Sequence, residues 1–386
     1  MNKTSFDYII CGGGASGLLL AKEMICDPYF KEKTFLLIEK NQKQSNDRTW
    51  CFWESGQSEF ESVTHHQWDN ARFKSNDVTL NFSLDPFQYK MLRSGDFYEQ
   101  IHEKLNKSEQ ISSLQGTVLK IDTTANPSCV HTDQGVFNSD VIFSSILDPT
   151  ELLRQKRYPV LQQHFIGWFV KTEQPCFEPD RITFMDFDIP QKGETRFLYV
   201  LPFNSNEALV EYTLFSKTLL EDKEYEAGIA SYLKEINAGS YTILEKEKGS
   251  IPMSCYRFAK KNTNQLFHIG TAGGWTKAST GFTFYKTLQK TKKLVAYLKT
   301  NKPLSSFEKR NRFWYYDLLF LDVLYHYNGL GSKLFSSMFQ NIKPKLVFRF
   351  LDEKSTLWEE FKIMSSFPVF LFVKALFKRV FRAFYA

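Results

Sequence analysis

The glycine motif near the start of the chain limits its fold more than any other feature. Residues 6–11 form a short apolar run typical of a buried strand, and residues 18–24 have helical spacing. Between them, Gly12, Gly14 and Gly17 give the spacing G-x-G-x-x-G. The first glycine of such a turn allows a tight bend, the second lets the backbone approach a pyrophosphate, and the third lets the helix pack on the strand. We therefore predict a β-α-β unit that binds a dinucleotide.

The residues around this motif predict where the nucleotide would lie. Residues 34–39 form a second apolar strand, and Glu39 at its end can accept hydrogen bonds from ribose hydroxyls. The free N–H groups and the positive dipole end of the helix suit phosphates. The predicted cofactor-binding residues of this unit are Gly12, Gly13, Gly14, Ala15, Ser16, Gly17, Glu39 and Lys40.

A second glycine cluster, at residues 270–274, favours FAD over NAD as the dinucleotide. It follows a strand-like run and resembles the late flavin-proximal motif of the glutathione-reductase-like and hydroxylase-like flavoproteins. In those proteins the backbone of this motif approaches the flavin and its ribityl phosphate. They usually have an Asp after the first glycine, where this chain has Thr271, and this disfavours a generic hydroxylase.

Strand and helix signals along the rest of the chain predict an α/β protein. Its Rossmann-like, glutathione-reductase/hydroxylase-like FAD-binding domain would carry an inserted mixed or antiparallel sheet and a C-terminal helical region. The predicted ranges are 1–60, 90–150 and 245–300 for the FAD-binding domain, 61–89 and 151–244 for the substrate domain, and 301–386 for a helical, membrane-associating region.

Four segments resemble the bacterial and plant lycopene cyclases, flavoproteins that form carotenoid rings. They are residues 47–53 (DRTWCFW), 184–188 (FMDFD), 201–202 with 210–213 (LP and VEYT), and 270–282 (GTAGGWTKASTGF). The resemblance runs from residue 6 to the C-terminal helices. The chain departs from the family at Tyr212, where a second acid is common, and at Ala278 and Phe282, where Pro and Tyr are common. These departures leave the ring type open.

The resemblance implies a lycopene β-cyclase, an isomerase that depends on FAD and NAD(P)H without net redox change. A proton would add to a terminal double bond of lycopene, a second double bond would attack the resulting cation, and proton loss would complete the ring. The products would be γ-carotene and then β-carotene. The family requires reduced FAD, for which NAD(P)H would supply the electrons.

Glu211 is the catalytic acid/base that the resemblance implies. It follows Leu209 and Val210 on a predicted strand, and a carboxyl group in an apolar pocket keeps its proton at neutral pH because desolvation raises its pKa. From the residues alone, an outward-facing strand position is an alternative. Asp186, in a similar context, is expected either to orient Glu211 and shape the pocket or to be a turn residue before Pro190.

Further cofactor contacts and pocket walls are expected at positions spread along the chain. The remaining predicted cofactor-binding residues are Arg48, Thr49, Arg93, Val118, Gly270, Gly273, Gly274, Thr280, Gly281 and Phe282. For both arginines a plain surface charge is the alternative. Aromatic faces stabilise cations, so the candidates for lining a substrate tunnel, with core packing as the alternative, are Trp50, Phe52, Trp53, Trp168 and Phe184.

Composition narrows the remaining classes of function. A net charge of +6 without a recognisable binding module argues against nucleic acid, and six scattered cysteines without a C-x-x-C pair predict no metal site. No signal peptide is recognised, so a reducing, cytosolic compartment is expected. The 37 Phe residues indicate either an aromatic core or a large apolar ligand.

The C-terminal residues predict an amphipathic, cationic helix. Its apolar stripe is Phe370, Val373, Phe377, Val380, Phe381 and Phe384, and its basic stripe is Lys374, Lys378 and Arg382. Such a helix suits an anionic membrane interface, and we expect a peripheral protein on the cytoplasmic side of a membrane. A terminal helix packed on the core, with a solvated basic face, is the alternative.

Two other classes of function stay open at this stage. One is a redox flavoprotein, either a monooxygenase or an isoprenoid reductase acting on a lipophilic substrate. The other is a non-catalytic carotenoid- or lipid-binding protein, which the intact glycine motif and Glu39 disfavour. The oligomeric state is not predicted.

Overall fold

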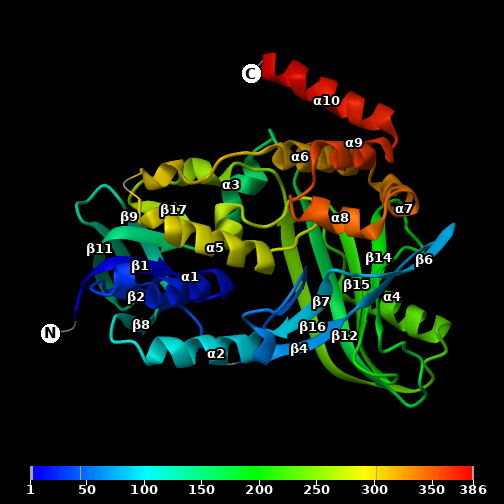
Figure 1. The fold of residues 1–386 in the computed structure, drawn as a ribbon, viewed down its shortest axis with the longest axis horizontal. Helices are drawn as coiled ribbons and strands as arrows, with labels where there is room; N and C mark the ends of the chain where they lie inside the picture. Colours follow the sequence, from blue (N-terminus) through cyan, green and yellow to red (C-terminus); the bar gives the residue numbers. More distant parts are fainter. Residues whose placement is uncertain (1–2, 44, 301, 385–386) are drawn as a thin grey trace.

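Residues 3–43, 45–300 and 302–384, the part of the chain that the computed structural model describes, form three β-sheets joined and covered by helices (Figure 1). The first sheet contains the strand of the glycine motif. Its strands run in the order β8 (Ile111–Gln115), β2 (Phe35–Glu39), β1 (Ser5–Cys11), β11 (Gly135–Ser144), β10 (Ser128–Thr132) and β9 (Val118–Asp122), and β17 (Leu266–His268) also pairs with β11.

The first sheet has the parallel centre expected of a dinucleotide-binding unit. Strands β8, β2, β1, β11 and β17 are parallel to their neighbours, whereas β10 and β9 are antiparallel additions at one edge. Helix α1 (Ala15–Cys26) follows β1 and packs on the later helix α5 (Phe284–Leu298). Buried side chains such as Leu19, Phe143 and Leu294 join these elements in one apolar cluster. Segments that lie far apart in the sequence thus complete a single Rossmann-like layer.

A second sheet lies beside the first, on the right of Figure 1. Among the described residues it also has seven strands, but most of them are longer, so it is the larger sheet. Its order is β16 (Tyr241–Met253), β12 (Leu161–Thr172), β15 (Glu207–Ser216), β14 (Thr195–Pro202), β13 (Arg181–Asp186), β5 (Asn70–Ser75) and β6 (Val78–Ser83). Neighbouring strands are antiparallel except for β13 and β5. The small third sheet, β3 (Thr49–Glu54), β7 (Gln88–Arg93) and β4 (Thr64–Trp68), connects the two larger ones in sequence.

Helices cover both faces of the larger sheet. Helix α4 (Asp222–Glu235) packs on one face through an apolar cluster that includes Leu198 and Tyr212. The opposite face carries Phe73, Phe184 and Phe197, which pack against the C-terminal helices. The other helices are α2 (Ser94–Asn106), α3 (Pro149–Arg154), α6 (Arg312–His326), α7 (Gly331–Asn341), α8 (Pro344–Leu351), α9 (Leu357–Ser365) and α10 (Val369–Phe384).

This architecture has the layers that the sequence predicts: a Rossmann-like part, an inserted sheet and C-terminal helices. The sequence also predicts a helix near residues 284–298, after the second glycine cluster, and α5 has those bounds. Strand β16, a long strand that the sequence analysis did not identify, crosses residue 245, where the predicted domain boundary lies. The division into domains stays a prediction. None of the helices formed by the described residues is both long and apolar enough to span a bilayer.

Candidate active site

The glycine turn after β1 has the geometry that a bound pyrophosphate needs. Gly12 adopts a φ of +101°, which favours glycine, and a side chain at Gly17 would place its Cβ 1.9 Å from the Gly12 carbonyl oxygen. A Cβ at Gly14 would meet open space. Helix α1 begins there without a side-chain cap from any described residue. The turn therefore leaves N–H donors and room in front of the helix.

Glu39 lies beside this turn, as the fingerprint predicts. Its Oε2 accepts a hydrogen bond from the Gly13 N–H (2.5 Å), and its Oε1 accepts one from the Asn41 N–H (3.1 Å). The Gly116 N–H donates to the Glu39 carbonyl oxygen (3.0 Å), which brings the start of β9, with Val118, close to the end of β2. Lys40 is exposed next to Glu39.

The two glycine clusters meet in space. Gly270 adopts a φ of +60°, and a Cβ there would lie 2.0 Å from Oγ of Ser16. The segment Gly270–Gly273 forms a short 3-10 helix directly after β17, and Gly274 follows in the left-handed region. Residues predicted to bind one cofactor are thus adjacent even though the sequence separates them widely.

A cavity of about 450 Å³ extends from the second glycine cluster into the larger sheet. Predicted cofactor-binding residues line one part of it: Arg48, Thr49, Thr280, Gly281 and Phe282. Aromatic side chains line much of the rest: Trp50, Tyr89, Phe165, Phe184, Phe197, Tyr199, Phe215, Phe284, Phe335 and Phe339. Glu211 lies in the wall of the same cavity. The structure therefore brings the predicted acid together with the late glycine loop in one mainly apolar space.

Glu211 is a buried carboxyl group with little polar compensation. It sits on β15 with a relative exposure of 7%, and the Thr213 hydroxyl donates a hydrogen bond to its Oε1. Desolvation, reinforced by the nearby charge of Glu247, raises the pKa of Glu211 to about 8. Glu211 therefore carries a proton at neutral pH, as a general acid requires.

Glu247 is a second carboxyl group in the cavity wall and was not found from the sequence. It lies on β16, and its Oε2 accepts a hydrogen bond from the Thr49 hydroxyl (2.6 Å). Desolvation raises its pKa as well, although the hydrogen bond from Thr49 and the charge of Arg93 oppose this. The available signal in the sequence was the alternation of acidic and basic residues over 245–248, which puts Glu245 and Glu247 on one face of β16, the less exposed one.

Two tyrosines extend the polar wall beside Glu211. The hydroxyls of Tyr89 and Tyr199 are 2.7 Å apart, and Tyr199 is the strand neighbour of Glu211 on β14. Burial raises the pKa of both hydroxyls and of the Cys51 thiol well above their usual ranges. These groups stay neutral at physiological pH, so they can orient or solvate a proton without adding charge.

The residues around the glycine loops fit a bound flavin nucleotide. Oγ1 of Thr280 and Oε1 of Gln163 are buried and have no hydrogen-bond partner among the described residues, and both residues line the cavity. Gly281 adopts a φ of +75°, and a Cβ there would lie 1.8 Å from Oε1 of Gln163. Unsatisfied polar atoms beside a turn without side chains would find partners in a polar cofactor bound there.

Asp186 requires a correction. Its strand neighbour Leu198 belongs to the apolar cluster under α4, and Asp186 itself faces Lys74 (3.7 Å), so it lies on the opposite face of the sheet from Glu211. It lines no part of the described cavity. A register shift between Thr183 and Asp186 causes this, because the extra residue of a bulge reverses the alternation of the strand.

The other predicted site residues divide between the cavity and the protein body. Arg48 is exposed at the cavity edge. Arg93 is buried and paired with Glu245 (2.5 Å), and its guanidinium lies 4.4 Å from the ring centroid of Phe169. Of the five aromatic tunnel candidates, Trp50 and Phe184 line the cavity, whereas Phe52, Trp53 and Trp168 pack in apolar clusters.

Comparison with known families shows to which of them the chain belongs. The sequence model of the family described as lycopene cyclase protein matches residues 7–377. The chain belongs to the lycopene cyclase family. A curated lycopene beta-cyclase from Pseudescherichia vulneris is 21% identical over 254 residues, which cover 64% of this chain. The match spans 62% of the length of that relative.

Solved structures support the fold of this lycopene cyclase family member. A geranylgeranyl bacteriochlorophyll reductase-like protein from Thermoplasma acidophilum superposes with a TM-score of 0.66 at 12% identity, covering 98% of this chain and 100% of the other. The flavin-dependent brominase Bmp2 superposes with a TM-score of 0.59 at 13% identity, covering 90% of this chain and 93% of the other. A tryptophan halogenase from Shewanella frigidimarina gives 0.58 at 13%, covering 98% and 94%. The predicted fold class is confirmed.

Proposed function

We propose that this member of the lycopene cyclase family is a lycopene β-cyclase that converts the linear ends of lycopene to β-ionone rings, through γ-carotene to β-carotene. The observation that carries the proposal is Glu211, a buried and protonated carboxyl group in an aromatic cavity that adjoins the late glycine loop. The family match over residues 7–377 supplies the substrate class.

The reaction needs an acid, a dry wall and a base, and the cavity residues supply these functions. Glu211 donates its proton to the terminal double bond, where a C–H bond forms and a tertiary cation remains. The π electrons of a second double bond then form the ring C–C bond. A proton leaves the new ring cation to form the ring double bond and returns to carboxylate. Aromatic faces such as those of Phe184 and Phe197 exclude water and stabilise the cation.

The residues of the two glycine clusters would hold FAD. Gly12, Gly14 and the start of α1 would bind the pyrophosphate, Glu39 the ribose, and the segment with Thr280 and Gly281 the flavin end. Reduced flavin, with NAD(P)H as the electron donor, would supply negative charge near the cation without net redox change. Arg48 at the cavity edge is available for a phosphate.

Expression in cells that accumulate lycopene tests the proposal. Wild-type protein should convert red lycopene to orange-yellow β-carotene, measured by chromatography of the pigments. Glu211→Gln should fold, retain flavin absorbance and lose at least ~100-fold in ring formation, because the amide has no acidic proton to transfer to the substrate.

Glu207→Gln is the matched control for that variant. Glu207 lies on the same strand, β15, but pairs with Lys171 (2.7 Å) away from the cavity, so ring formation should be unchanged. Ring formation by Glu211→Gln at the wild-type rate would reject Glu211 as the acid. Oxidation of NAD(P)H in proportion to a hydroxylated or saturated product would instead identify a monooxygenase or a reductase.

The outer surface of the C-terminal helices supports a peripheral membrane location. The outward stripe of α10 contains the predicted apolar residues Phe370, Val373, Phe377, Val380 and Phe381, all exposed, and α9 adds Leu357, Trp358, Phe361 and Met364. Monomeric soluble proteins rarely expose apolar groups together in this way. The side chains of Arg382 and Phe384 lie outside the described part of the chain.

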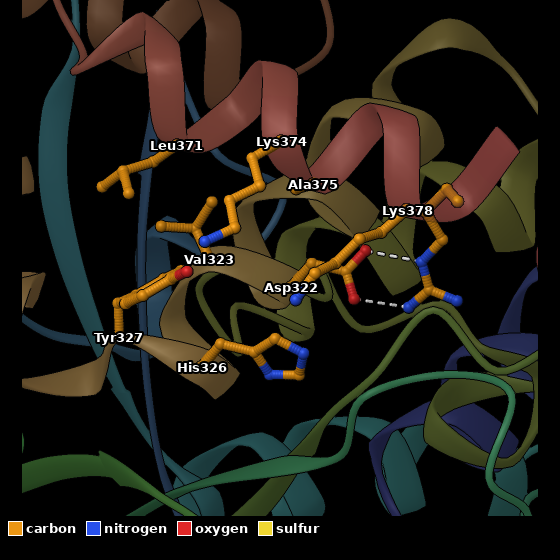
Figure 2. A pocket seen from close by; sticks show the side chains of 9 residues that line it. Asp322, Val323, His326, Tyr327, Leu371, Lys374, Ala375 and Lys378 are labelled. Atoms are coloured by element: carbon orange, nitrogen blue, oxygen red, sulfur yellow. Dashed lines mark hydrogen bonds and ion pairs between the residues drawn. The ribbon is translucent and has the colours of Figure 1, made fainter. Parts of the chain in front are cut away.

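Helix α10 is attached to the body by a different face from its apolar stripe. Figure 2 shows Leu371, Lys374, Ala375 and Lys378 above Asp322 of α6 and Tyr327, the residue that follows this helix. Arg379 pairs with Asp322 through two hydrogen bonds of 2.5 Å, and the Lys374 ammonium lies 5.6 Å from the ring centroid of Tyr327. The apolar stripe therefore stays unpaired, and we propose that it lies in the cytoplasmic interface of a membrane.

A further inference from the structure

Glu211 and Glu247 lie on two strands, β15 and β16, that pair with the two edges of the same strand, β12. Gly167 on β12 is the register partner of Glu211 on β15 and also of Glu247 on β16. Residues opposite one another in a sheet present their side chains to the same face. The two carboxyl groups therefore point to one side of the sheet with a glycine between them, and both line the cavity.

Gly167 places no side chain between the two acids, and the Leu209 and Glu247 side chains pack over it. A Cβ at this position would lie 3.2 Å from Cγ and 3.4 Å from Oε1 of Glu247, and 2.9 Å from Cδ1 of Leu209. The Glu247 side chain thus leans over Gly167 in the direction of Glu211. Because the backbones of β15 and β16 are about 10 Å apart, a larger residue at 167 would obstruct the approach of the two side chains.

Only part of the charge at Glu247 is balanced by its neighbours. Thr49 on β3 donates one hydrogen bond to it, and Arg93 on β7 is bound to Glu245, two residues away on the same strand. Arg48 acts on it from the cavity edge. On the Glu211 side, Thr213 is the hydroxyl donor, and the thiol of Cys51 and the hydroxyls of Tyr89 and Tyr199 are neutral. No described cation is paired with Glu211 itself.

We propose that Glu247 is the proton-sharing partner of Glu211, so that the two carboxyl groups across Gly167 carry one proton as a pair. The inference rests on the proposed cyclase function and assigns a role to a residue outside the recognised motifs. Interacting acids of this kind titrate as a unit, because ionising one group makes ionising the other harder. Glu247 acts through Glu211 and need not contact the carotenoid.

The proton balance of the pair matches an isomerisation. The pair begins with one proton and one negative charge. Transfer of the proton to the substrate forms a C–H bond and leaves two carboxylates facing a carbocation, so attraction to the cation offsets the repulsion between them. Loss of a proton from the ring cation forms the ring double bond and restores one proton to the pair. No proton, electron or other reactant is consumed.

The pH profile of ring formation by full-length, flavin-loaded protein tests this role. Ring formation should fall at alkaline pH as the pair loses its last proton. In Glu247→Gln the amide can still accept the Thr49 hydrogen bond but carries no charge, so Glu211 should ionise more easily. The alkaline limb of the profile, the pH range in which ring formation falls as the pH rises, should therefore lie about one pH unit lower than in the wild type. The control Glu207→Gln should superpose on the wild type.

A Glu247→Gln profile with the wild-type alkaline limb would overturn the proposal, even if the rate fell, because a structural role lowers the rate without moving the limb. The pH dependence of unfolding gives a second readout that needs no turnover. The wild type should lose stability towards alkaline pH more steeply than Glu247→Gln, and equal slopes would also overturn it. Absence of ring formation by the wild type would reject the cyclase function, while the unfolding result would still decide the pairing.

Discussion

The burial of Glu211 makes the stability of the protein depend on pH. Its pKa is about 8 when folded against 4.5 as an ordinary carboxyl group, so the folded state keeps a proton that the unfolded state releases between these values. Stability is then fully present below pH 4.5 and is lost as pH rises towards 8. The slope contributed by one such group is about 1.4 kcal/mol per pH unit.

Glu211→Gln should remove much of this slope. The measurement is the free energy of unfolding in urea at several pH values between 5 and 8, for the variant and the wild type. The free energy of unfolding of Glu211→Gln should increase relative to that of the wild type as the pH rises, whereas that of Glu207→Gln should not. Parallel curves for wild type and Glu211→Gln would mean that Glu211 is ionised in the folded state.

Single residues mark the limit of what the sequence predicts. Glu211 was identified because apolar neighbours and a family resemblance pointed to the same position. Glu247 was missed because β16 carries charged residues on both faces. The more and the less exposed face therefore do not differ in hydrophobicity, and the sequence does not show which face is buried. Asp186 was grouped with Glu211 because both lie in an apolar strand context, and a bulge that the sequence does not reveal turns Asp186 to the other face of the sheet.

At the scale of elements, a buried charge network ties the late glycine loop to the C-terminal helices. Lys277 is 3% exposed and lies 3.0 Å from Asp317 on α6 and 3.4 Å from Glu353, which follows α8. Ser279 also donates a hydrogen bond to Asp317 (2.9 Å). The loop proposed to hold the flavin is therefore fixed by α6 and by Glu353, which follows α8, a helix that lines the cavity.

Lys277→Met should be strongly destabilising. The change leaves Asp317 and Glu353 with less compensation in a buried site, and breaking a buried pair costs about 3–5 kcal/mol. Chemical unfolding of the variant measures it. Lys292→Met is the matched control on α5, because Lys292 is half-exposed and pairs with Glu59 at 3.3 Å, and it should cost under about 1 kcal/mol. Equal losses in both variants would show that the network does not stabilise the fold.

Elements with a local signal were predicted, and elements defined by distant partners were not. The strand, glycine turn and helix at the start of the chain follow from residues within one window, and so does α5. The pairing of β13 with β5, or of β17 with β11, joins segments far apart in sequence and leaves no local pattern. The cavity exists between such segments, so its shape could not be predicted from the sequence.

At the scale of the whole molecule, the chain has 37 Phe residues, and the described ones lie in three kinds of setting. Some fill the core under α1 and α5, as Phe97 does, and some line the cavity, as Phe184 does. Others, such as Phe370 and Phe377, are exposed on α10. With α10 in a membrane as proposed, a hydrocarbon would meet little water either there or in the aromatic cavity.

Changing Phe370 and Phe377 to Ser should weaken binding to anionic liposomes by roughly 10-fold or more, because each removes exposed apolar area from the interface. Flotation of the purified protein with vesicles measures this. Leu119→Ser with Leu244→Ser removes two equally exposed apolar groups, on β9 and β16, and should leave binding intact. Unchanged flotation of the phenylalanine variant would reject α10 as the membrane contact.

The contact between Ser16 and Gly270 has a consequence for folding of the protein during its synthesis on the ribosome. The first half of the proposed nucleotide cradle emerges early, but its counterpart, together with β17 and α5, is translated only after the whole larger sheet. Until β17 has been synthesised, the first sheet therefore lacks the strand that pairs with residues 142–144 of β11. Uptake of the cofactor would be among the last events of biogenesis and would act as a check that the chain has been completed.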